Sequence, residues 1–195
     1  MAAERPGLSP TRGPVIERTE GLGEEQADEL VSRLQTVAGW RVAFPRLDAA
    51  GPAVAGALIR GLAHPHPRVR QWCAALLDHH ADSRCVPGLV GLLDDPVAAV
   101  RRHAVHSLGC QPCKAAPLAV DVVDLLLERI RRDPSVRVRR VAVHLLGCQP
   151  ADPRALAALT SLATGDPDPR IRRVARWGQS RHQPALPARQ APTSG

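Results

Sequence analysis

Hydrophobic residues recur through most of the chain in one repeated helical pattern. In the segment 133–148, small aliphatic residues stand four positions apart at Val138, Ala142 and Leu146. Such positions lie within about 80° around a helix, so they predict one buried stripe on an amphipathic helix. Related segments precede and follow it, and successive copies are separated by 31, 38 and 33 residues. The equivalent positions are Val69, Val100, Val138 and Ile171. Periods of this size are typical of stacked helical units.

A second apolar segment with helical spacing precedes each repeated one, which predicts pairs of helices. We expect the first helices of these pairs at residues 52–63, 86–94, 117–132 and 153–164. Asp-Pro predicts a capped start for the second helices, at Asp95-Pro96, Asp133-Pro134 and Asp166-Pro167. Asp152-Pro153 predicts the start of a first helix in the same way. Gly109 and Gly147 predict the ends of two second helices.

The two ends of the chain follow different patterns. Residues 24–38 have helical spacing, and the stretch from Trp40 to Gly51 is interpreted as a degenerate copy in which Pro45 would kink the helix. Residues 1–23 and 179–195 are rich in Pro, Gly and polar residues without periodicity, and are expected to be disordered tails. The predicted repeat domain therefore covers residues 24–178, with clear repeats in 52–178.

The repeated motif Asp-Pro-x-x-x-Val-Arg-x-x-Ala-x-x-x-Leu-Gly resembles HEAT repeats, and among them the short bacterial type first associated with phycobilin lyases. The resemblance implies an all-α, right-handed α-solenoid of four to five HEAT-like helical hairpins. It also implies a ladder of hydrogen bonds between successive units, made by Asp and Arg six residues apart. The first copy has His64 in place of Asp, opposite Arg70, so the ladder is in doubt there. The three complete pairs are Asp95/Arg101, Asp133/Arg139 and Asp166/Arg172.

The amino-acid composition indicates the charge of the protein and its cellular compartment. The 195 residues carry 26 basic and 19 acidic side chains, for a net charge of +7, and the acids are concentrated in residues 1–30. A basic body favours acidic partners such as nucleic acid or acidic protein surfaces. Five cysteines without disulfide-framework spacing, and no secretory signal, predict a reduced, cytoplasmic protein. No apolar run of about 18 residues is present, so we expect no membrane-spanning helix.

Histidine and cysteine residues raise the question of a metal site. Two copies of the repeat have His and Cys at equivalent positions, and Cys110 and Cys113 form a Cys-x-x-Cys pair. These donors are Cys110, Cys113, Cys148, His79, His80, His103, His106 and His144. Neighbouring helices lie about 8–10 Å apart, which is far for ligands of one ion. We therefore favour packing roles and expect no metal or cofactor, with a zinc site or a redox pair as less favoured alternatives.

Arginines gather at the predicted N-terminal ends of the second helices. They stand just before and two residues after the stripe's first position, at Arg68, Arg102, Arg137, Arg140, Arg170 and Arg173. Cations at a helix N-terminus are locally unfavourable, so these arginines either face solvent or bind an anion. No phosphate loop or catalytic motif is found, and the sequence indicates no catalytic residue.

Two functions fit these observations. The favoured one is a non-catalytic adaptor that binds a protein partner, acidic or otherwise, through a concave surface of the second helices. The alternative is a nucleic-acid-binding protein, because some bacterial DNA glycosylases are HEAT-like solenoids with a basic concave face. The absence of Tyr and the placing of two tryptophans in second helices argue against base flipping. The candidate binding residues are Trp72, His103, His106, His144, Arg102, Arg140 and Arg173.

Overall fold

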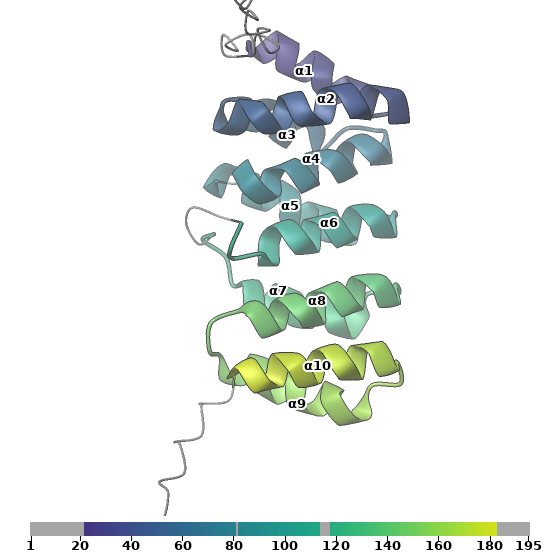
Figure 1. The fold of residues 1–195 in the computed structure, drawn as a ribbon, viewed down its shortest axis with the longest axis vertical. Helices are drawn as coiled ribbons and strands as arrows, with labels where there is room; N and C mark the ends of the chain where they lie inside the picture. The colour runs from purple at the N-terminus through teal and green to yellow at the C-terminus, as the bar shows by residue number, and fades with distance from the viewer. Residues whose placement is uncertain (1–21, 81, 114–117, 183–195) are drawn as a thin grey trace, which may run out of the picture.

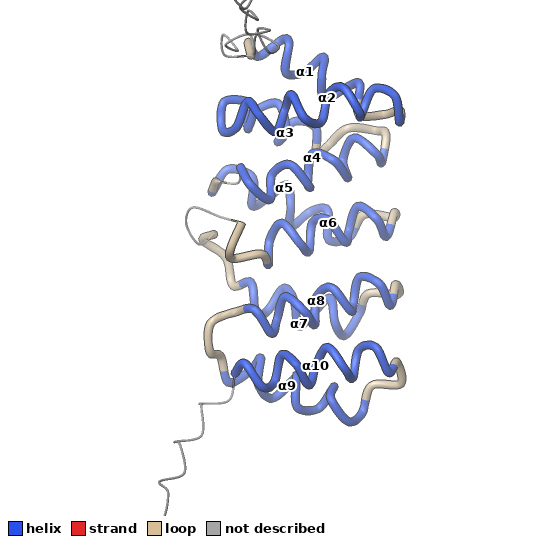
Figure 2. The backbone as a smooth tube through the Cα atoms, viewed as in Figure 1, coloured by secondary structure: helices blue, strands red, loops and turns tan. Residues whose placement is uncertain are grey.

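The computed structural model describes residues 22–80, 82–113 and 118–182, and within these ranges the protein is an all-α solenoid. The ten described α-helices, α1 to α10, form five hairpins. Figure 1 shows these hairpins stacked along one axis, and Figure 2 shows no strand in the described part. The expectation of an all-α solenoid is confirmed. The predicted tails fall mostly outside the described residues, but residues 179–182 are helical, because the last helix continues to His182.

The helices form two layers, one from each member of the hairpins (Figure 1). The first layer contains α1 (Glu24–Arg33), α3 (Ala55–Gly61), α5 (Val86–Gly91), α7 (Val122–Arg132) and α9 (Pro153–Gly165). The second layer contains α2 (Val37–Ala50), α4 (Pro67–His80), α6 (Ala98–Gly109), α8 (Val136–Cys148) and α10 (Pro169–His182). Short 3₁₀ turns precede α3 and flank α5, at Gly51–Val54, Ser83–Cys85 and Leu92–Asp94.

The repeated stripe forms the core of the second layer. Val138, Ala142 and Leu146 have no exposed surface, and the equivalent residues of α4 and α6 are at most 1% exposed. The stripe of each helix packs against its own partner and the neighbouring units, so one hydrophobic core runs the length of the described solenoid. Helical periodicity alone was enough to identify this core.

The ladder between units is present, with two corrections. Arg70 donates to the Asp95 carboxylate at 2.6 Å, so the first unit contributes a rung although it has His64 in place of Asp. Arg101 donates to both carboxylate oxygens of Asp133, at 2.7 and 3.0 Å. Among the described residues Arg139 forms no equivalent ion pair and donates instead to the Asp133 and Pro134 carbonyls. The ladder therefore has two carboxylate rungs, displaced by one unit from the expected start.

The Asp-Pro motif acts outside the helix at all three of its second-layer sites, since Asp166 accepts from the Asp168 amide and α10 begins only at Pro169. Asp95 accepts from the Val97 amide and Asp133 from the Ser135 amide, each at 2.8 Å. Their helices begin only at Ala98 and Val136. The carboxylate therefore closes a turn before the helix, where it also faces the ladder arginine, and is not the N-cap. Asp152 does cap α9 as expected.

The sequence correctly placed two glycines near helix ends, but their predicted role as helix caps is wrong. Gly109 is the last residue of α6 and Gly147 is next to the end of α8. Neither has a positive φ, which among the described residues occurs only at Gly51. A Cβ on Gly147 would lie 2.6 Å from the Gly178 Cα, and one on Gly109 would lie 3.0 Å from Leu145. Close helix approach requires these glycines, so they are packing positions.

The first hairpin contains the degenerate copy. α2 is continuous through Pro45, whose position is exposed. The stretch Val37–Gly61 is long and apolar enough, by length and composition, to cross a membrane, contrary to the expectation that no such stretch exists. Here Gly51, with a φ of 61°, ends α2 before the chain continues into α3. Leu47 and Leu58 have no exposed surface, so this stretch supplies core residues to the solenoid.

Candidate functional site

Arginines of three second-layer helices surround one hollow. Its volume is about 570 Å³, and it lies beside the N-terminal ends of α6, α8 and α10. A smaller hollow of about 190 Å³ shares Arg102 and Arg137 with it. We call the larger one the arginine hollow. Its lining residues are Arg102, Val136, Arg137, Arg140, Val141, Asp168 and Arg170.

The arginine hollow is electrostatically unbalanced. None of its four arginines forms an ion pair with a described residue. The Arg102 guanidinium contacts the neighbouring His103 ring, with Nη2 3.4 Å from His103 Nε2. The adjacent Arg101, by contrast, is buried in its ion pair with Asp133. The positive ends of three helices add to the same field. With four guanidinium groups and one carboxylate, Asp168, in its lining, the hollow is suited to an anion. Arg173, which the sequence analysis grouped with these arginines, is exposed but does not line the hollow.

Trp72 and His103 lie in an aromatic cluster and are only partly accessible. The Trp72 ring packs against Trp40 and Phe44, with centroids 5.1 and 5.7 Å apart, and His103 lies 5.7 Å from its other side. Burial, followed by the charge of Arg102, lowers the pKa of His103 to about 4. His103 is therefore neutral at physiological pH and acts as a packing group between the cluster and the hollow.

His144 lies on a more accessible part of the same layer. Its ring stacks on Trp177 with centroids 4.8 Å apart and an angle of 17°, and the Arg181 guanidinium lies 5.3 Å from the Trp177 ring centre. Trp177 is 40% exposed, which makes it one of the few large apolar side chains at the surface. Sequence reasoning named His144 but did not include Trp177 among the binding residues, although Trp177 occupies the repeat position that holds His106 and His144 in the preceding copies.

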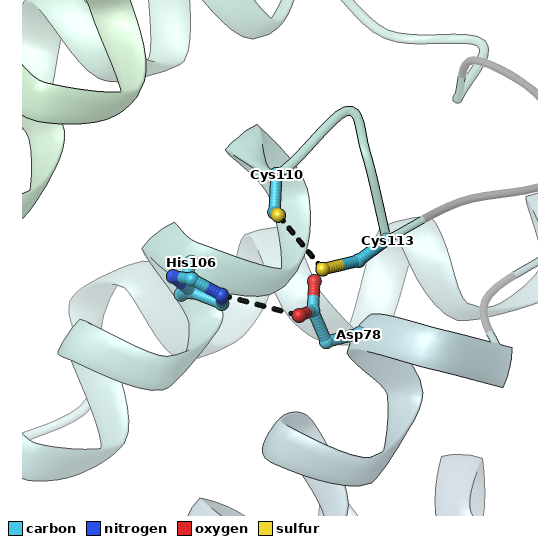
Figure 3. A group of neighbouring side chains, drawn as sticks. All are labelled: Asp78, His106, Cys110 and Cys113. Carbon is cyan, nitrogen blue, oxygen red and sulfur yellow. Dashed lines mark hydrogen bonds and ion pairs between the residues drawn. The ribbon is translucent and has the colours of Figure 1, made fainter. Parts of the chain in front are cut away.

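A second group of functional side chains lies at the other end of α6. One ligand atom each from Asp78, His106, Cys110 and Cys113 lies within 4.8 Å of all the others (Figure 3). His106 Nε2 is 3.1 Å from Asp78 Oδ2, and the Cys110 and Cys113 sulfurs are 2.9 Å apart. The hydrogen bond between the thiols, burial and the nearby Asp78 raise the pKa of Cys113 to about 12. Two thiols, an imidazole and a carboxylate are donors suited to a transition metal.

The sequence argument against a metal rested on the distance between neighbouring helices, and it missed Asp78. The side chain of Asp78 comes from the last turn of α4 and is 5% exposed, while His106 and Cys110 lie one turn apart on α6. The signal was present in the repeat, because Asp78 stands where later copies have Gly109 and Gly147. The equivalent pair in α8 is His144 and Cys148. These residues are not part of the group, and His144 Nε2 lies 3.9 Å from Cys148 Sγ.

Comparison with known proteins agrees with the repeated helical pairs. A family model described as HEAT repeats matches residues 55–122 and 123–178, which together make up more than half of the chain. The match does not distinguish the short bacterial type of repeat. The sequence has no significant match among curated proteins.

Proposed function

Since the chain belongs to the HEAT-repeat family, whose members generally act as protein-interaction scaffolds, we propose that it is a non-catalytic adaptor for a protein partner. The binding surface is the exposed face of the second-layer helices α6, α8 and α10, centred on the arginine hollow. The observation that supports this most directly is the gathering of four arginines without carboxylate partners around one hollow.

The lining of the hollow indicates the chemistry of the partner. Arginine forks bind carboxylates through paired, charge-assisted hydrogen bonds. Val136 and Val141 add apolar surface between the arginines, and Val136 is 39% exposed. A segment with Asp or Glu residues on either side of an apolar residue therefore fits best. Trp177, stacked on His144, offers a second apolar contact on α10.

Nucleic acid is the alternative, because the same arginines could hold phosphates. Two observations favour an acidic protein. Val136 and Val141 lie in the lining, where an apolar peptide side chain can use their surface and a phosphate backbone cannot. Trp40 and Trp72 pack against each other and Trp177 against His144, so their faces are engaged in ring contacts and are poorly placed for base stacking.

The test compares labelled probes by fluorescence anisotropy across a salt series. The probes are a Glu-rich peptide containing Leu residues, duplex DNA and single-stranded DNA. The test variant is Arg137→Ala/Arg140→Ala, and Arg41→Ala/Arg131→Ala loses the same charge outside the hollow. We expect peptide affinity to fall about tenfold in the hollow variant, because each partly exposed arginine–carboxylate contact contributes up to about 1 kcal/mol.

Two results would contradict the proposal. An equal loss in both variants would show that only net charge attracts the peptide. Tighter binding of DNA than of peptide, with log K falling against log salt at a slope near −3.6 for about four phosphates, would favour the nucleic-acid function.

A further inference from the structure

We propose that Asp78, His106, Cys110 and Cys113 bind one Zn²⁺ ion that joins the second hairpin to the third. A tetrahedral zinc site with bonds of ~2.0–2.3 Å separates its donor atoms by about 3.3–3.8 Å. The four donor atoms lie within 4.8 Å of one another, with Cys110 Sγ 2.9 Å from Cys113 Sγ and His106 Nε2 3.1 Å from Asp78 Oδ2. Shifts of about 1 Å or less would therefore place all four around an ion.

The backbone brings the four donors to one point from two helices and a loop (Figure 3). His106 and Cys110 are one helical turn apart at the end of α6, so their side chains share a face. The chain then turns back so that Cys113 meets Cys110, and Asp78 points across from the end of α4. With two sulfurs, a nitrogen and an oxygen, the set suits zinc and not the all-oxygen coordination of Mg²⁺ or Ca²⁺.

Repeat copying does not explain this group. Copying accounts for His106 and Cys110, because His144 and Cys148 stand at the same places in the next unit. The other two donors are specific to this boundary: Gly109 replaces Asp78, and Ala151 replaces Cys113, in the next copy. Among the residues that the structure describes, the set of four donors is therefore complete only where the end of α4 meets the end of α6 and the residues that follow α6.

A zinc ion here would have a structural role. Four protein ligands fill a tetrahedral site and leave no position for a substrate or an activated water. Cys113 lies in the connection between α6 and α7, which has more residues than the connection 149–152 between α8 and α9. A bound ion would hold the start of the connection after α6 against α4. The site is separate from the arginine hollow, which lies at the opposite end of α6.

The test measures zinc in tag-free full-length protein that is purified with a phosphine reductant and without chelator. We expect about one zinc per chain in the native protein and in Cys148→Ser, which removes a cysteine from the equivalent position of α8. Asp78→Asn and Cys113→Ser should lower zinc affinity by more than about 100-fold, since even the loss of a supporting contact costs 10–100-fold. Asp78→Asn keeps side-chain size, so its fold can be verified by circular dichroism.

Cobalt substitution gives a second readout. Native protein loaded with Co²⁺ should show intense tetrahedral d–d bands and thiolate charge-transfer absorption, and the latter should weaken in Cys113→Ser. Zinc content in the native protein no higher than in Cys113→Ser would overturn the proposal. A metal-free Cys110–Cys113 disulfide, trapped by alkylation at lysis, would overturn it in favour of a redox pair.

Discussion

At the scale of single residues, two adjacent arginines have opposite roles. The Arg101 side chain is 9% exposed and paired with a fully buried Asp133, whereas Arg102 faces the arginine hollow without a carboxylate partner. A buried ion pair adds little over an apolar pair, but removing one partner leaves the other charge buried and uncompensated. Arg101 therefore serves the connection between units, and Arg102 is available for binding.

Asp133→Asn should destabilise the protein by about 3 kcal/mol at neutral pH, because it removes the charge that compensates Arg101. Urea unfolding at pH 7 measures the loss. Asp166→Asn is the matched control, since Asp166 occupies the same repeat position but forms no ion pair with a described arginine, and it should cost less than about 1 kcal/mol. Equal losses in the two variants would contradict the importance of the rung.

The pH dependence of that loss has a definite sign. Burial acts to raise the pKa of Asp133, but hydrogen bonds from Arg101 and the Ser135 amide outweigh it and the net pKa is lowered. A lowered folded-state pKa contributes stability that is complete above the ordinary value of about 3.9 and is lost as pH falls through the folded value. The difference between the native protein and Asp133→Asn should therefore shrink in acid.

At the scale of helices, the spacing between α8 and α10 depends on a pair of glycines. Gly147→Ala would place a Cβ 2.6 Å from the Gly178 Cα and 3.1 Å from the Trp177 ring. Backbone cannot move aside as a flexible side chain can, so we expect a loss of about 1–3 kcal/mol. This exceeds the gain of up to about 1 kcal/mol from better helix propensity.

Gly165→Ala is the control for Gly147→Ala. Gly165 ends α9 with open space around its Cα and without a positive φ, so alanine there should be neutral or stabilise by up to about 1 kcal/mol. Thermal unfolding of both variants measures the contrast. A stabilised Gly147→Ala would show that the two helices can separate without cost.

Local sequence patterns predicted the structural features that lie within one hairpin. They did not predict the sites that neighbouring hairpins form together. The stripe and the paired helices followed from periodicity, because burial on one face imposes it. The individual arginines were also predicted, but their gathering in one hollow depends on how α6, α8 and α10 stack. Asp78 was missed because the repeat position that it shares with Gly109 and Gly147 was interpreted only as a helix end, whereas its closeness to His106 and Cys110 depends on how the hairpins stack. The glycines were interpreted as helix caps because a cap and a close contact between helices both favour glycine, and the sequence alone does not distinguish the two roles.

At the scale of the whole molecule, the solenoid is a one-dimensional stack in which each hairpin packs mainly against its neighbours. Leu58 in α3 and Ile171 in α10 are almost completely buried, in the second and fifth hairpins. Leu58→Ala should cost about 2–5 kcal/mol and Ile171→Val about 0.5–1.5 kcal/mol. Because two hairpins separate the sites, the double variant should lose the sum to within about 0.5 kcal/mol.

Arg101 and Asp133 give the contrasting case, because they join neighbouring hairpins directly. Arg101→Met combined with Asp133→Asn should lose clearly less than the sum of the single losses, since each single change already removes the ion pair and the double change leaves neither charge buried alone. Urea unfolding of all six variants gives both coupling energies. A coupling above about 1 kcal/mol between Leu58 and Ile171 would mean that strain passes from the fifth hairpin to the second, so that a ligand at the arginine hollow would act on the second hairpin.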